Sequence, residues 1–307
     1  MNTRPVIFGE VLFDCFADGH RVLGGAPFNV AWHLQAFGCA PLLVSRLGSD
    51  DDGQVIRKAM TDWGMSEKGL QTDSVHSTGQ VVVSVHNGEP EYDIVDPSAW
   101  DFIAETELTG LNKLDGLNEQ SVELIYHGSL ALRHETSRQA LNVLTQQQQA
   151  PIFMDVNLRD PWWQQAHLLS LMDQATWVKI NEHELQLLVE GNDDHSRARQ
   201  LMTRHKLSLV IVTQGSRGAF ALTADGESAS VSPETVTNVV DTVGAGDAFA
   251  SVCMLAIMRQ WDIADMLDRA QQFASVMVAR QGATVNDSQL YKSMLEDWHC
   301  DQLSMQF

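Results

Sequence analysis

The sequence predicts a three-layer α/β fold built on a doubly wound, mainly parallel sheet, together with a small separate β-sheet. Short continuous apolar runs, which suit buried strands, alternate with helical segments over much of the chain. Polar residues gather directly after these runs, where the parallel strands of one sheet end together. A hairpin between Val75 and Val95 has no helix between its strands, so it lies outside the parallel sheet.

Length and composition indicate a globular protein. The length allows one large α/β domain or two smaller ones, and we expect a single domain over residues 1–307. The chain has 307 residues, of which 44% are hydrophobic and 20% are charged, so it can bury a large core. Its formal net charge of -20 disfavours binding to nucleic acid or to an anionic membrane. A phosphorylated ligand would therefore need a local site and a divalent cation.

The sequence contains neither a signal-peptide core nor an apolar run long enough to span a membrane. Its four cysteines are scattered, without the spacing of a metal site. We therefore expect a cytoplasmic protein with reduced thiols.

The N-terminal part begins with a predicted buried strand over Val6–Phe13, which ends at Asp14. This places Asp14 at the edge where open α/β sheets bind ligands. The pair Gly24-Gly25 then precedes a helix that starts near Asn29, and the glycines serve either as a hinge or as a tight turn.

A second predicted strand, Pro41–Leu47, leads through the acidic residues Asp50–Asp52 into a helix up to about Gly64. Because consecutive side chains on a helix diverge, these aspartates favour helix capping and solvated acids over a metal site. The hairpin follows, with its turn at Asn87-Gly88. Trp100 is expected in the core.

From Leu124 onward, strands and helices alternate regularly. Strands are predicted at Leu124–Ser129, Pro151–Asn157, Trp177–Asn181 and Leu209–Thr213, and helices after Glu135, near Leu168 and from Glu184. The polar residues at the strand ends predict a ligand cleft; they are Asp155, Asn157, Arg159, Asn181, Glu184, Thr213, Gly215 and Gly218.

The turn Gly244–Asp247 precedes an apolar helix over Ala248–Met258. Its glycines allow successive N–H groups to converge on an anion at the positive end of that helix. Asp247 beside such a site serves either as a base for a nucleophile that attacks phosphorus, or as an acid that complements the helix dipole.

Several motifs together resemble the ribokinase-like (PfkB-type) carbohydrate kinases, including their bacterial fructokinase members. The resemblance covers nearly the whole chain and rests on Gly24–Ala31, Asp155–Arg159, Asn181–Glu184, Thr213–Gly218 and, most specifically, Asp241–Phe249.

The resemblance implies transfer of the γ-phosphoryl group of ATP to a sugar hydroxyl, most simply of fructose. It implies that Asp247 is the base and that the amides of Gly244, Ala245 and Gly246 form an anion hole. Sugar contacts are implied for Asp14, Gly25, Asn29 and Arg159.

The resemblance also implies the nucleotide and metal contacts. Asn181 and Glu184 would organise Mg²⁺, Glu184 through water, and Asp241 is a candidate for K⁺. ATP contacts are implied for Asn181, Glu184, Thr213, Gly215, Gly218 and Ser275, where Ser275 replaces an asparagine that is frequent in the family. A lid of about residues 15–25 and 75–98 would close over the sugar and pair two copies in a homodimer.

Three alternatives remain open from the sequence. The substrate could be ribose, 2-keto-3-deoxygluconate or a nucleoside, because a few pocket contacts set specificity. The chain could instead be a catalytically silent sugar-binding regulator. A nucleotide-dependent oxidoreductase is disfavoured, because neither GxxxxGK[ST] nor a GxGxxG after the first strand is present.

Overall fold

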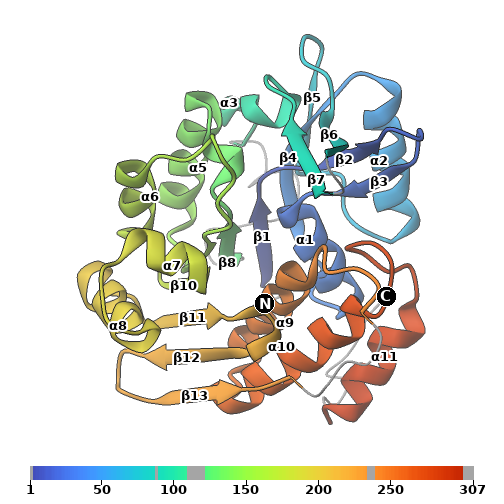
Figure 1. The fold of residues 1–307 in the computed structure, drawn as a ribbon. Coiled ribbons are helices and arrows are strands. Elements are labelled where there is room, and N and C mark those ends of the chain that lie inside the picture. Colours follow the sequence, from blue (N-terminus) through green and yellow to red (C-terminus); the bar gives the residue numbers. More distant parts are fainter. Residues whose placement is uncertain (1–2, 87–88, 109–121, 234–238, 300–307) are drawn as a thin grey trace. The chain divides into compact units, whose positions relative to one another are not determined.

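A computed structural model describes residues 3–86, 89–108, 122–233 and 239–299 (Figure 1). Its contacts divide the chain into two compact units. The first contains the residues up to Ala31 together with Pro41–Ala150, and the second contains Trp32–Ala40 together with the residues from Pro151 onward. Each unit has its own set of parallel strands, so the predicted mainly parallel α/β fold with a smaller separate sheet is confirmed.

The first unit contains four parallel strands in the order β8-β1-β4-β5. Val6, Ile7 and Phe8 are consecutive on β1 and at most 1% exposed. Since neighbouring side chains on a strand point to opposite faces, both faces of β1 are covered, as the continuous apolar run predicts. The strands are β1 (Arg4–Phe8), β4 (Leu42–Gly48), β5 (Leu70–Asp73) and β8 (Val122–His127). The helices are α2 (Asp51–Asp62), η1 (Ala99–Phe102), α3 (Glu105–Leu108), η2 (Leu130–Leu132) and α5 (Glu135–Gln148).

The same unit carries the small sheet, with the order β3-β2-β6-β7. Its strands are β2 (Leu12–Phe16), β3 (Arg21–Gly24), β6 (Gly79–His86) and β7 (Glu89–Ile94). β6 and β7 pair antiparallel, with Val82 opposite Asp93, so the predicted hairpin outside the parallel sheet is confirmed. Its turn, Asn87-Gly88, lies outside the described residues.

The prediction of one strand over Val6–Phe13 is wrong. The first strand ends before Gly9, whose φ of 151° is accessible to glycine but strained for other residues. A Cβ at Gly9 would also lie 2.4 Å from the side chain of Pro27. β1 and β2 therefore belong to different sheets, and Asp14 is in the middle of β2 rather than at the end of a parallel strand.

The acidic turn before α2 confirms the predicted cap and corrects one detail. Asp50 caps α2, since its carboxylate accepts a hydrogen bond from the N–H of Gly53 at 2.9 Å. Asp52, however, is not a solvated acid: it forms an ion pair with Arg21 of β3 and accepts a hydrogen bond from Gln80 of β6 at 2.8 Å. The hydrogen bond from Arg21 lowers the pKa of Asp52. Asp52 thus attaches α2 to the small sheet.

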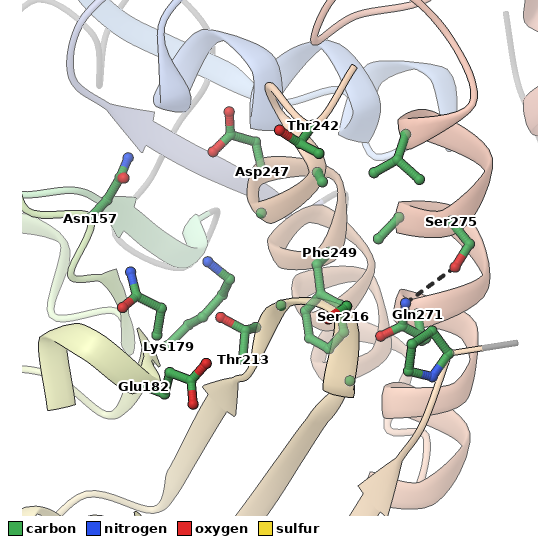
Figure 2. A pocket seen from close by; sticks show the side chains of 18 of the residues that line it. Asn157, Lys179, Glu182, Thr213, Ser216, Thr242, Asp247, Phe249, Gln271 and Ser275 are labelled. Atoms are coloured by element: carbon green, nitrogen blue, oxygen red, sulfur yellow. Dashed lines mark hydrogen bonds between the residues drawn. The ribbon is translucent and has the colours of Figure 1, made fainter. Parts of the chain in front are cut away.

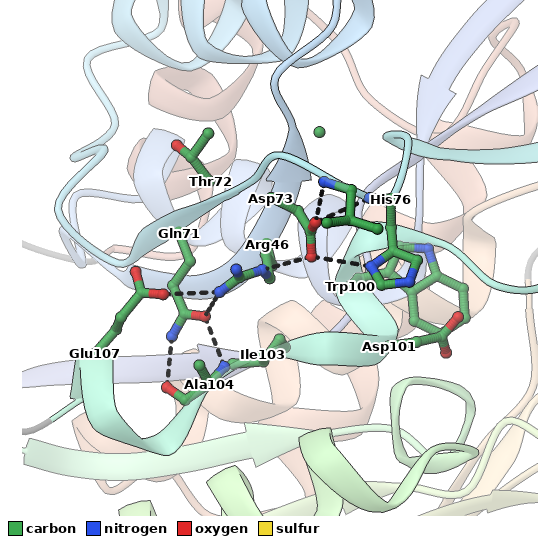
Figure 3. Close-up of polar contacts among 12 residues, drawn as sticks. Arg46, Gln71, Thr72, Asp73, His76, Trp100, Asp101, Ile103, Ala104 and Glu107 are labelled. Atoms are coloured by element: carbon green, nitrogen blue, oxygen red, sulfur yellow. Dashed lines mark hydrogen bonds and ion pairs between the residues drawn. The ribbon is translucent and has the colours of Figure 1, made fainter.

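A buried polar network joins β4, β5 and the segment after η1 (Figure 3). Arg46 donates to Asp73 at 2.9 Å and to Gln71 at 3.0 Å, and Gln71 in turn exchanges hydrogen bonds with the backbone of Ala104. Burial opposes ionisation of Asp73, but hydrogen bonds from the backbone and ring of His76 outweigh it and hold the pKa of Asp73 at about 2. Trp100, next to this network, is fully buried, as predicted.

The second unit contains five strands in the order β13-β12-β11-β10-β9. β9, β10 and β11 are parallel, whereas β12 and β13 pair antiparallel and had no counterpart in the sequence prediction. The strands are β9 (Ile152–Asp155), β10 (Trp177–Asn181), β11 (Leu209–Thr213), β12 (Ala219–Thr223) and β13 (Ser228–Val231). The helices are α6 (Gln165–Met172), α7 (Glu182–Leu188), α8 (Asp194–His205), η3 (Gly215–Arg217), α9 (Ala245–Arg259), α10 (Ile263–Val278) and α11 (Ser288–Asp297).

Helix α1 (Ala26–Ala36) begins in the first unit and ends in the second. Cys15, Cys39 and Cys253 are free thiols, and Cys300 lies outside the described residues. Within the described ranges, no helix has the length and apolar character needed to cross a bilayer.

Candidate active site

A pocket of about 730 Å³ lies within the second unit, at the C-terminal ends of β9, β10 and β11 (Figure 2). Its other walls are the N-terminal turn of α9 and one side of α10. This is the edge of a parallel sheet at which the sequence predicts a cleft. The predicted site residues that line it are Asp155, Asn157, Asn181, Glu184, Thr213, Gly215, Gly218, Ala245, Gly246, Asp247 and Ser275.

The predicted anion-binding turn forms the first turn of α9. Gly244 is the N-cap residue with φ 78°, and the helix runs from Ala245 to Arg259. The first N–H groups of a helix have no partner within it, and the helix dipole makes this end positive. Asp247 is the acid of that first turn and reaches into the pocket (Figure 2). Amide donors and a carboxylate therefore occur together at one helix terminus.

Gly244 has no space for a side chain. A Cβ at this position would lie 2.3 Å from the Cβ of Ala283 and 2.6 Å from its Cα. The backbone at Ala283 therefore packs directly against Gly244, and both the positive φ and the close approach require glycine.

Lys179 is a site residue that the sequence analysis missed. It is 6% exposed, and its ammonium group donates to both carboxylate oxygens of Asp155, at 3.0 and 2.8 Å. A Cβ added to Gly246 would lie 3.6 Å from its Nζ atom. Burial alone would lower the pKa of Lys179, but the charges of Asp155, Asp247 and Glu184 raise it, so the amine stays protonated. The sequence did contain a sign of this role, because Lys179 is the one charged residue within the otherwise apolar strand Trp177–Ile180.

Asn181 and Glu184 form a capping box at the start of α7. The side chain of Asn181 accepts from the N–H of Glu184 at 2.9 Å, and Glu184 accepts from the N–H of Asn181 at 2.9 Å. The other carboxylate oxygen of Glu184 accepts from the N–H of Leu158 at 2.8 Å. Burial raises the pKa of Glu184, which is 6% exposed. Glu184 therefore holds together the segments that follow β9 and β10.

The loop after β11 contributes the glycine-rich wall of the pocket. A Cβ at Gly218 would lie 1.9 Å from the carbonyl oxygen of Val231, and its φ is 98°, so only glycine fits. The N–H of Gln214 donates to the carbonyl of Gly218 at 2.7 Å and closes the loop. Arg217 of this loop forms an ion pair with Glu182 at the start of α7.

The opposite wall is mainly apolar, with one polar pair. Gln271 donates a hydrogen bond from Nε2 to Oγ of Ser275 at 3.1 Å, and both residues line the pocket from α10 (Figure 2). The apolar residues around them are Pro233, Val239, Ala274 and Val278. An apolar wall with few polar groups is typical of a pocket for an aromatic or heterocyclic ligand.

The predicted sugar-side residues Asp14, Gly25 and Asn29 gather in the first unit. A Cβ added to Gly24 would lie 3.7 Å from Oδ2 of Asp14 and 3.8 Å from Oδ1 of Asn29. Gly25 has φ 108°, and a Cβ there would lie 2.8 Å from the carbonyl of Glu10, as the tight-turn interpretation requires. These residues therefore form one local cluster.

Besides the three sugar-side residues, Gly244, Arg159 and Asp241 are predicted site residues that do not line the pocket. Arg159 is exposed and donates to the carbonyl of its neighbour Leu158 at 2.9 Å. The carboxylate of Asp241 accepts from the N–H groups of Val243 at 2.9 Å and Gly282 at 3.0 Å. Asp241 therefore shapes the turn before α9.

A profile of the pfkB family carbohydrate kinases matches residues 15–289. The chain belongs to this family. Among pfkB relatives, a probable chloroplastic fructokinase-6 of Arabidopsis thaliana is 31% identical over 269 residues, which cover 80% of this chain and 68% of that protein. A fructokinase of Escherichia coli is 27% identical over 304 residues, which cover 92% of this chain and 95% of that protein.

The crystal structure of a fructokinase from Vibrio cholerae O395, bound to fructose, ADP and calcium, superimposes with a TM-score of 0.82. The two sequences are 25% identical, and the match covers 95% of this chain and 99% of that one. For a pfkB carbohydrate kinase, the reaction is the transfer of a phosphoryl group to a sugar hydroxyl. This chemistry depends mainly on positioning and on charge stabilisation.

Proposed function

We propose that this pfkB kinase is a fructokinase that transfers the γ-phosphoryl group of ATP to a hydroxyl of fructose. The observation that carries the proposal is the position of Asp247 in the pocket, in the same helical turn as the amides of Ala245 and Gly246. A carboxylate beside an anion site repels phosphate, and a role as the base for the attacking hydroxyl explains its presence there. The choice of fructose is supported by the names of the relatives and by the fructose-bound structural neighbour.

In the proposed reaction, Asp247 accepts the proton of the attacking sugar hydroxyl. The hydroxyl oxygen forms a bond to the γ-phosphorus, and the bond from that phosphorus to the bridging oxygen breaks, which releases ADP. The N–H groups of Gly244, Ala245 and Gly246 stabilise the charge on the transferred group. Protonated Lys179, next to Gly246, offsets part of the negative charge of Asp155, Asp247 and Glu184 on the same side of the pocket.

ATP is proposed to bind along the pocket in the second unit. Thr213, Gly215 and Gly218 supply backbone groups beside the phosphates, and the apolar wall around Ser275 receives the adenine ring of ATP. The carboxylate oxygens of Glu184 and the amide oxygen of Asn181 are ligand atoms of the kind that Mg²⁺ prefers. Because burial destabilises the charged form of Glu184, a nearby cation would stabilise it. When bound, Mg²⁺ supplies charge neutralisation at the phosphates. K⁺ at the Asp241 turn is part of the same proposal.

The sugar is proposed to contact Asp14, Gly25, Asn29 and Arg159. The small sheet and its connections, about residues 15–25 and 75–98, are proposed as a lid within a single kinase domain. The lid carries exposed apolar side chains, which support a homodimer formed through it: Phe16, Val82 and Tyr92 on its strands, and Val95 directly after β7. A cytoplasmic location also belongs to the proposal.

The decisive experiment measures phosphorylation of fructose and other sugars with Mg-ATP, together with the variant Asp247→Asn. Loss of the base should lower kcat by about 10²–10⁴-fold. Asp265→Asn is the matched control, because Asp265 is the acid in the first turn of the neighbouring helix α10 and does not line the pocket. Normal turnover by Asp247→Asn would refute the assignment of the base.

The sugar panel tests the substrate separately. Fructose should have the highest kcat/KM among fructose, ribose, 2-keto-3-deoxygluconate and a nucleoside. Preference for another member would replace fructose as the substrate. Sugar binding by calorimetry without production of ADP would instead favour a silent regulator.

A further inference from the structure

His33 is a fully buried histidine of α1 that the proposed reaction does not use. Its Nδ1 atom lies 2.9 Å from the hydroxyl of Tyr291, and its Nε2 atom lies 3.1 Å from the carbonyl oxygen of Ala283. The ring meets Phe273 edge-on, with 5.1 Å between the ring centroids. All four residues belong to the second unit.

The two contacts determine the protonation of the ring. A carbonyl oxygen only accepts, so Nε2 of the neutral ring carries the hydrogen. Nδ1 then accepts from the hydroxyl of Tyr291 at 2.9 Å, which is closer than the alternative acceptor of that hydroxyl, the carbonyl of Val285 at 3.4 Å. Burial lowers the pKa of His33 to about 3, and burial raises the pKa of Tyr291. At neutral pH the imidazole is therefore an uncharged donor to Ala283.

The segment that accepts this hydrogen bond is held at neighbouring positions. The N–H of Gly282 donates to Asp241 at 3.0 Å, and the indole N–H of Trp32 donates to the carbonyl of Val285 at 3.0 Å. Ala283, between these two points, is the residue that packs against Gly244. His33 thus fixes the backbone that packs against the N-cap of α9.

We propose that His33 is a positioning residue for the anion-binding turn. By holding the carbonyl of Ala283, it keeps the surface behind Gly244 in place, and with it the direction of the N–H groups from Gly244 to Asp247. Tight packing transmits such a constraint, because a buried backbone without voids cannot move alone. A misplacement of about 1 Å in a phosphoryl-transfer site can lower the rate by about 10²-fold. This inference rests on the proposed function of the turn.

The test compares His33→Leu, which removes both hydrogen bonds, with His33→Gln, whose amide N–H can replace the Nε2 donor. We expect His33→Leu to lower kcat by about 10–100-fold, with the KM values for sugar and ATP changed less than about 3-fold. His33→Gln should recover most of the lost kcat. If His33→Leu does not fold, His33→Phe takes its place, because it keeps an aromatic ring against Phe273.

His205→Leu is the matched control. His205 is also buried in the second unit, where its Nδ1 atom lies 2.6 Å from Asp173, and it does not line the pocket. The variant His205→Leu should be less stable than the wild type, but its kcat should be unchanged at a temperature where it is folded. A kcat for His33→Leu equal to that of the wild type would overturn the proposal, as would equal losses in His33→Leu and His33→Gln or in His33→Leu and His205→Leu.

Hydrogen exchange gives a readout that does not depend on catalysis. The amides of Ala245 and Ala248, which donate to the carbonyls of Thr242 and Gly244, should exchange faster in His33→Leu than in the wild type, and this change should be absent from His205→Leu. Unchanged exchange in an active kinase would refute the role of His33. A wild-type protein that phosphorylates no sugar would instead refute the proposed function.

Discussion

The ammonium group of Lys179 contacts both carboxylate oxygens of Asp155, at 3.0 and 2.8 Å, in the interior of the second unit. The two side chains are only 7% and 3% exposed. Each charge therefore depends on the other for compensation, because water is excluded from both. The pair also lies against the turn of Gly246, so the same charges belong to the core and to the pocket.

Lys179→Met should therefore destabilise the protein strongly. Removal of one partner leaves the Asp155 carboxylate buried without its cation, which costs about 3–5 kcal/mol. Urea denaturation measures the free energy of unfolding. Lys58→Met is the control, since the Lys58–Asp62 pair is exposed at 74% and 61%, and its loss should cost less than about 1 kcal/mol. Equal stability of Lys179→Met and Lys58→Met would show that the buried pair contributes nothing.

Gly244→Ala should inactivate the kinase through geometry. The added Cβ would lie 2.3 Å from that of Ala283, so the turn or the segment behind it must move. Gly226→Ala is matched for backbone strain, because Gly226 has φ 98° but nothing within 4 Å of an added Cβ. We expect kcat to fall by about 10²-fold in Gly244→Ala and to remain unchanged in Gly226→Ala. A normal kcat in Gly244→Ala would mean that the turn tolerates displacement.

Features that depend on neighbouring residues could be predicted from the sequence. The hairpin, the cap at Asp50 and the turn before α9 each occupy one continuous stretch with its own turn chemistry. The carboxyl ends of β9, β10 and β11 also met as expected, because parallel strands share a direction.

Features that depend on distant partners could not be predicted in this way. Lys179 and its ion-pair partner Asp155 are 24 positions apart in the chain, and Asp52 and its partner Arg21 are 31 positions apart. The break at Gly9 was hidden by an apolar run that continues on both sides of it. β13 has no continuous apolar run. β12 has a buried run, Ala219–Leu222, which the sequence analysis did not assign to a strand.

The polar network around Asp73 predicts how stability responds to acid (Figure 3). The pKa of Asp73 is about 2 in the folded protein, below that of an unfolded aspartate, about 3.9. The unfolded chain therefore binds the proton first, so this contribution is present above pH 4 and is lost as the pH falls toward 2. Asp73→Asn should have a lower Tm than the wild type at pH 7, and the difference should shrink between pH 4 and pH 2.

Thermal unfolding at a series of pH values measures this difference. Asp62→Asn is the control, because the side chain of Asp62 is 61% exposed and forms an ion pair with the exposed Lys58. Its Tm should follow that of the wild type at every pH. If the difference in Tm between wild type and Asp73→Asn stays constant down to pH 2, the stabilisation by Asp73 does not come from its ionised form. The hydrogen bonds of Arg46 and His76 would then act on a neutral partner, contrary to the charge-assisted network described above.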